Sequence, residues 1–135
     1  ARSVVVHPGS IVGDRSLDDR LRALFEQGKK DSPEYEALRL DVIRHRAQEA
    51  PPFVDQTMKS LSEIVAFARE TGILLGLENR YRYYDIPLPH ELDLFLAEFN
   101  EDWIGFQYDT GHGYTLDALG LVVPIPTLPS PLTIK

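Results

Sequence analysis

Cysteine is absent from the 135-residue sequence, and so are long hydrophobic runs. Without cysteine the chain forms no disulfide bond, thiolate zinc site, iron–sulfur cluster or cysteine nucleophile. No apolar run approaches the ~20 residues that cross a bilayer, so we expect no membrane-spanning segment. The first residues, from Ala1 to Val6, lack the long apolar region of a signal peptide. We therefore expect a cytoplasmic protein.

Positive charge is also scarce, because 14 Lys and Arg residues stand against 21 Asp and Glu residues and give a net charge of −7. Non-specific affinity for nucleic acid comes from Lys and Arg at phosphates, so a nucleic-acid partner is not expected. The acidic balance favours a small-molecule partner. The length is that of one domain with a single hydrophobic core.

The spacing of apolar residues predicts an α/β fold in which strands alternate with helices. Short apolar runs predict strands over about 3–6, 73–77 and 103–108. Helical crossovers between successive strands make them parallel. Three separate sets of residues recur at helical spacing between the first two strands: Leu17, Leu21, Leu24 and Phe25; Tyr35, Leu38, Val42 and Ile43; Val54, Met58, Leu61, Val65 and Ala68.

Local signals mark the limits of this helical region and one more helix. Ser32 before Pro33 predicts an N-cap with proline in the first turn, and Gly72 predicts a helix end. A further short helix is expected to follow His90. We interpret His45 and His90 as surface residues of their helices.

Polar residues follow each of the three predicted strands at its carboxyl end. His7 follows the first strand, Glu78 with Asn79 the second, and Asp109 with His112 the third. The carboxyl ends of parallel strands meet at one edge of a sheet, where α/β proteins build their sites. Converging carboxylates and imidazoles form a ligand set for a divalent cation. The alternatives are a solvated carboxylate at Glu78 and a helix cap or turn residue at Asp109.

Three short motifs resemble a known superfamily. Val6-His7-Pro8-Gly9, Leu77-Glu78-Asn79-Arg80 and Asp109-Thr110-Gly111-His112, in this order, resemble the xylose isomerase-like TIM barrels. These include sugar isomerases, epimerases and the endonuclease IV family. The 31 residues from Glu78 to Asp109 also match one unit of a (β/α)₈ barrel.

The resemblance implies roles for individual residues. Glu78 and Asp109 would be metal ligands, and Glu78 would also be the catalytic base. His112 and His7 would contact substrate, or zinc in an endonuclease. Arg80, in the loop after Glu78, is a further candidate for binding substrate through an anionic group, although a solvated loop arginine is an equal alternative. The neighbouring Tyr81, Tyr83 and Tyr84 would stack on a sugar or pack between loops.

The family's metal site is completed by a histidine and a glutamate from its last two strands, which this sequence does not supply. We therefore expect residues 1–120 to form a partial (β/α)₈ TIM barrel of about three parallel strands, and 121–135 to form a proline-rich extended tail. Its divalent metal ion (Mn, Mg, Co or Zn) would be weakly bound or absent. Uncovered strand edges would favour a homo-oligomer.

Three functions follow from this interpretation. The first is a fragment of a metal-dependent isomerase or epimerase acting on a sugar or sugar phosphate. The second is an endonuclease IV-like zinc phosphodiesterase acting on DNA, which the two histidines favour and the net charge disfavours. The third is a non-catalytic barrel fragment that self-associates.

Overall fold

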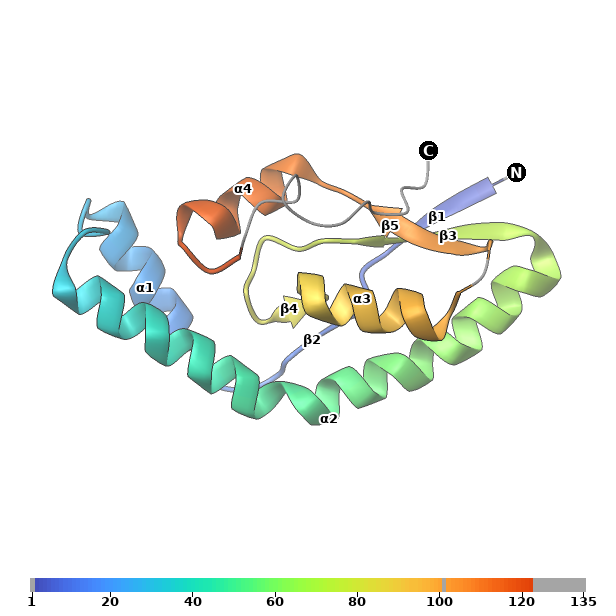
Figure 1. The fold of residues 1–135 in the computed structure, drawn as a ribbon, viewed down its shortest axis with the longest axis horizontal. Coiled ribbons are helices and arrows are strands. Elements are labelled where there is room, and N and C mark those ends of the chain that lie inside the picture. The colour runs from blue at the N-terminus through green and yellow to red at the C-terminus, as the bar shows by residue number, and fades with distance from the viewer. Residues whose placement is uncertain (1, 101, 123–135) are drawn as a thin grey trace.

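A computed structural model describes residues 2–100 and 102–122 of the chain. The fold is α/β, and Figure 1 shows its elements in chain order. They are β1 (Arg2–Val6), β2 (Gly9–Ser10), α1 (Ser16–Glu26), α2 (Pro33–Thr71), β3 (Ile73–Glu78), β4 (Asp85–Ile86), α3 (Pro89–Glu98), β5 (Ile104–Gln107) and α4 (Thr110–Ala118).

The main sheet has three parallel strands in the order β1-β3-β5. Val6 pairs with Leu77, and Leu77 pairs with Phe106. Helix α2 connects β1 to β3, and α3 connects β3 to β5. The predicted strands, their parallel pairing and their helical crossovers are confirmed. The strands β2 and β4 form a two-stranded antiparallel sheet, which the sequence analysis did not predict because each strand has only two residues.

The long helix α2 differs from the prediction. Two of the predicted helical sets belong to one helix of 39 residues, which runs through Pro51 and Pro52. Proline in a helix interior removes a backbone hydrogen bond and costs about 3 kcal/mol. Buried residues on both sides of the prolines, Val42 and Leu61 among them, pack into one core and offset that cost. Ser32 caps the helix and Gly72 ends it at φ 69°, as predicted.

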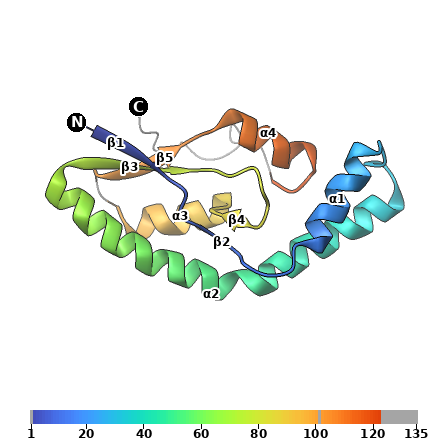
Figure 2. The ribbon, with the colours of Figure 1, turned by 180° about the vertical axis from the view of Figure 1, so that it is seen from behind.

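Helices α2 and α3 lie on the same side of the main sheet (Figure 1 and Figure 2). In both Figure 1 and Figure 2, α2 lies along one long side of the molecule with α3 between it and the sheet. Leu75, Leu77, Ile104 and Phe106 are buried in the core. Because side chains alternate along a strand, Glu78 lies on the opposite face from Leu77.

A buried polar centre joins α2 to the first turn of α3 and to the segment before it. Arg46 and Glu91, each 2 % exposed at the side chain, form a bidentate ion pair with distances of 2.7 and 2.8 Å. Arg46 also donates to the backbone carbonyls of Tyr83 and Asp85, and Glu91 accepts from the N–H of Leu88. This centre was not predicted.

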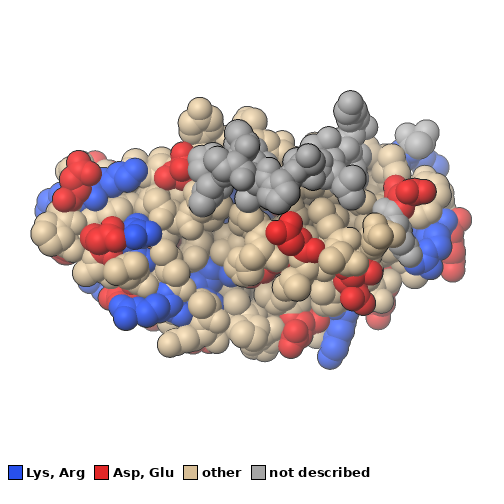
Figure 3. Space-filling model, in the orientation of Figure 1, with Lys and Arg blue, Asp and Glu red and all other residues tan. Residues whose placement is uncertain are grey.

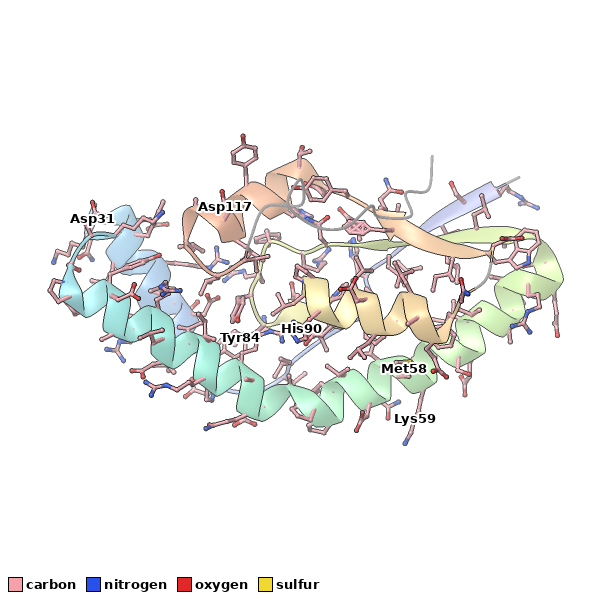
Figure 4. The ribbon with its side chains drawn as sticks, viewed as in Figure 1. Asp31, Met58, Lys59, Tyr84, His90 and Asp117 are labelled. Carbon is pink, nitrogen blue, oxygen red and sulfur yellow. The ribbon has the colours of Figure 1, made fainter. Side chains whose placement is uncertain are left out.

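The two helical histidines differ in environment. His90 is 71 % exposed, as predicted, and Figure 4 shows it at the start of α3. The surface interpretation of His45 is wrong, because its side chain is only 27 % exposed and its Nδ1 lies 2.6 Å from the buried Tyr84 hydroxyl. An apolar stripe predicts which helix face is buried, but not which polar residue beside it finds a buried partner.

No helix among the described residues is long and apolar enough to cross a membrane. Most of the predicted proline-rich tail, from residue 123 onward, lies outside the described residues. At its start, the Leu121 N–H donates to the carbonyl of Leu116, which ends α4 against the core.

Candidate metal centre

The carboxyl ends of β3 and β5 bring Glu78, Asp109 and His112 together. Glu78 ends β3, Asp109 follows β5, and His112 lies in the first turn of α4. One potential ligand atom from each residue lies within 4.8 Å of the other two. The prediction that both carboxylates lie at the same edge of the sheet is confirmed.

His7 joins this cluster from the adjacent strand. Its Nε2 lies 2.7 Å from Oε2 of Glu78 and, because a carboxylate only accepts, it donates. The His7 side chain is 54 % exposed, whereas that of Glu78 is only 14 % exposed. The other carboxylate oxygen of Glu78, Oε1, lies 3.5 Å from Nδ1 of His112.

Asp109 is both a helix cap and a member of the cluster. Its Oδ1 accepts from the backbone N–H of His112 at 2.9 Å, which satisfies one free donor at the start of α4. This hydrogen bond, together with the nearby His112 side chain, holds the pKa of Asp109 below its ordinary value although partial burial opposes it. Asp109 is therefore the helix cap that the sequence offered as an alternative. Its second oxygen, Oδ2, lies 3.7 Å from Nδ1 of His112.

The orientation of His112 follows from one hydrogen bond. Its Nδ1 lies 2.8 Å from the backbone carbonyl of Asn79. A carbonyl oxygen only accepts, so Nδ1 carries a proton and Nε2 is left with the lone pair of the neutral ring. The two carboxylates could therefore hold a cation, with His112 as a hydrogen-bond donor beside them.

The donor set fits a divalent cation. Glu78 and Asp109 present carboxylate oxygens close together, with no Lys or Arg among the described residues paired to either. Two neighbouring carboxylates repel each other unless a proton or a cation lies between them. Oxygen ligands suit Mg²⁺ and Mn²⁺, and an added imidazole suits Zn²⁺. Two carboxylates alone make a weak site.

The residues of the loop after Glu78 differ in how close they lie to the cluster. Arg80, a predicted substrate-binding residue, has its Nε 3.6 Å from Asp85 and lines a largely apolar cavity that Asn79 and Gly113 also line. Tyr83 and Tyr84 are buried packing residues. Tyr81 is 39 % exposed and its ring lies 5.2 Å from that of His112.

Asn79 was placed beside Glu78 in the predicted strand-end cluster, but no role was assigned to it. Its side-chain amide bonds to both backbone groups of Asp109, and its carbonyl holds His112. Its position directly after Glu78 was the only available signal.

A scan against family models and searches of curated proteins and of solved structures each found no match to this chain.

Proposed function

We propose that this chain carries part of the metal site of a sugar or sugar-phosphate isomerase or epimerase of the xylose isomerase-like type. Its three-stranded parallel sheet would be one section of a (β/α)₈ barrel. The observation that supports this most is the meeting of Glu78, Asp109 and His112 at the carboxyl edge of adjacent parallel strands. In barrels this edge is where catalytic residues lie.

Glu78 and Asp109 would hold the cation, and the remaining residues would act on the substrate. When bound, a divalent cation polarises the oxygens of a hydroxy-carbonyl substrate and acidifies the C–H between them. Glu78 would take and return that proton through a carboxylate oxygen. His112 would use the free side of its ring, Nε2, towards a substrate hydroxyl, because Nδ1 is bound to Asn79.

The test is calorimetric titration of the chain with Mn²⁺ and Zn²⁺, followed by an isomerisation assay on aldoses and ketoses. We expect weak binding that Glu78→Gln abolishes, because the change removes a charge at nearly constant shape. Glu63→Gln, at an exposed position of α2, is the matched control and should bind as the wild type does. Binding that survives Glu78→Gln would refute the proposed site.

Turnover is expected only when the ligands of the last two family strands are also present. Two carboxylates supply half of such a site, and catalysis also needs fixed geometry around the ion. In that complete site Glu78→Gln should abolish turnover and leave the fold intact. An unimpaired Glu78→Gln enzyme would contradict the role of Glu78 as the base.

An endonuclease IV-like phosphodiesterase is the second candidate, since two histidines flank the carboxylates and His7 contacts Glu78 directly. A phosphodiester substrate calls for a basic surface along the nucleic acid. On the face shown in Figure 3, Lys and Arg are interspersed with Asp and Glu instead of forming a stripe. Zn²⁺-dependent cleavage of a DNA duplex, without isomerase activity, would favour this candidate.

Self-association is the third candidate, and the exposed strand β1 favours it. β1 is an edge strand of the described sheet, and its Val4 and Val5 are 48 % and 47 % exposed. Such edges pair readily with a second strand. We expect sedimentation equilibrium at micromolar concentration to give a mass above 15.3 kDa. A compact species at that mass would exclude the self-associating form.

A further inference from the structure

Asn79 occupies the position at which the β3–β5 ladder ends. The last paired residues of the two strands are Glu78 and Gln107. Beyond them, Asn79 Oδ1 accepts from the N–H of Asp109 at 2.6 Å, and Nδ2 donates to the carbonyl of Asp109 at 3.0 Å. One side-chain amide thus replaces the backbone partner that Asp109 would have had in a longer strand.

These two bonds restrain the backbone on both sides of the Asp109 side chain. Asp109 has φ −99° and ψ 113°, an extended conformation, immediately before α4 begins. With its N–H and its C=O both held, the direction of its Cα–Cβ bond relative to β3 is set. The carboxylate therefore stays beside Glu78 instead of swinging away with the start of the helix.

The backbone carbonyl of Asn79 accepts a hydrogen bond from Nδ1 of His112 at 2.8 Å. Asn79 is thus bonded to both other members of the cluster and is covalently joined to Glu78. The short side-chain amide of asparagine offers a donor and an acceptor in one plane, which the two backbone groups of Asp109 require. An aspartate at this position would present a lone pair to the carbonyl of Asp109, and an alanine would present nothing.

We propose that Asn79 is the positioning residue of this centre: its side-chain amide keeps the Asp109 carboxylate at the distance from Glu78 that a shared divalent cation requires. This rests on the proposed metal site, although the hydrogen bonds do not. Residues that hold metal ligands in place change metal affinity by about 10–100-fold when they are removed. A merely structural asparagine would change the stability of the chain and leave the affinity of the folded protein unchanged.

The experiment compares Asn79→Ala with Asn100→Ala, which alters the only other asparagine, an exposed residue after α3. Mn²⁺ affinity is measured from the free-ion EPR signal at a temperature where all variants are folded. We expect a dissociation constant about 10–100-fold higher for Asn79→Ala and unchanged for Asn100→Ala. Asn79→Ser, which is too short to span both backbone groups, replaces the alanine variant if that variant does not fold.

A second readout follows the hydrogen bond without any metal. Amide hydrogen exchange at Asp109 should be faster in Asn79→Ala than in the wild type, because the acceptor of that N–H is gone. Equal Mn²⁺ affinity in the wild type and Asn79→Ala, or unchanged exchange at Asp109, would overturn the inference and leave the proposed site standing. A wild-type chain that binds no Mn²⁺ would overturn both.

Discussion

Two polar centres join distant parts of this chain, and they differ in how completely their charges are paired. At the Arg46–Glu91 centre both side chains are 2 % exposed, and the guanidinium bonds to both carboxylate oxygens and to two backbone carbonyls. At the strand edge, Glu78 and Asp109 face each other at 14 % and 38 % exposure with imidazoles as their partners.

The difference separates a structural centre from the proposed binding centre. A buried ion pair whose hydrogen bonds are complete has nothing left to offer a ligand, and its loss leaves an uncompensated buried charge. Two carboxylates with few cationic neighbours lower their mutual repulsion when a cation binds. Function is therefore expected where the charges are least completely paired.

The largest expected effect on stability is at the structural centre. Arg46→Ala should lower the free energy of unfolding by about 3–5 kcal/mol, because it leaves Glu91 buried without its partner. Urea denaturation followed by circular dichroism measures the change. Arg44→Ala, two positions away with a side chain 70 % exposed, is the matched control and should change stability by less than about 0.5 kcal/mol. Equal effects in the two variants would contradict the assignment.

A smaller effect is expected from Tyr84, which borders the structural centre. Burial, with a lesser contribution from the Asp18 carboxylate, raises the pKa of Tyr84 to about 12. The neutral phenol is thus favoured in the folded state, so its contribution is complete below pH 10 and is lost as pH rises towards 12. Ultraviolet titration of the phenolates should show a late component that Tyr84→Phe removes. A titration in which Tyr84→Phe removes no late component would contradict the buried placement of Tyr84.

The smallest effect on stability is expected at the proposed binding centre. Asp109→Asn should change the free energy of unfolding by less than about 0.5 kcal/mol, because asparagine caps a helix as well as aspartate does. The lowered pKa of Asp109 means that its ionised cap is present above the ordinary value of 3.8 and is lost as pH falls below it. The asparagine variant should lack that acid-side loss in a denaturation series from pH 5 to pH 2. A loss of unfolding free energy as large as that expected for Arg46→Ala would show that Asp109 has a structural role instead.

Residues close in sequence explain what could be predicted. The apolar run before Glu78 and the turn residues after Asp109 mark strand ends locally, and the parallel rule brings those ends together. The continuity of α2 through Pro51 and Pro52 could not be predicted, because packing against distant segments outweighs the local cost of proline. The Arg46–Glu91 pair spans 45 positions, and no local pattern marks either residue.

The positions of the strand-edge residues were predictable, but their bonding was not. The residue types at 7, 78, 109 and 112 indicated a cluster, whereas the tautomer of His112 and the role of Asn79 depend on which hydrogen bonds form in the folded chain. The ion pairing of Arg80 was not predictable either: its Nε lies 3.6 Å from Asp85, and its role in substrate binding stays a prediction.

The central claim is that Glu78 and Asp109 form the cation-binding centre of this chain. Paramagnetic broadening by substoichiometric Mn²⁺ in a ¹H–¹⁵N correlation spectrum tests it most directly, because the effect reports where the ion resides even when binding is weak. We expect the amide signals of Asn79 and of 109–113 to broaden first in the wild type, and to stay sharp in Asp109→Asn. Broadening spread over the acidic positions of α2, or unchanged in Asp109→Asn, would contradict the claim.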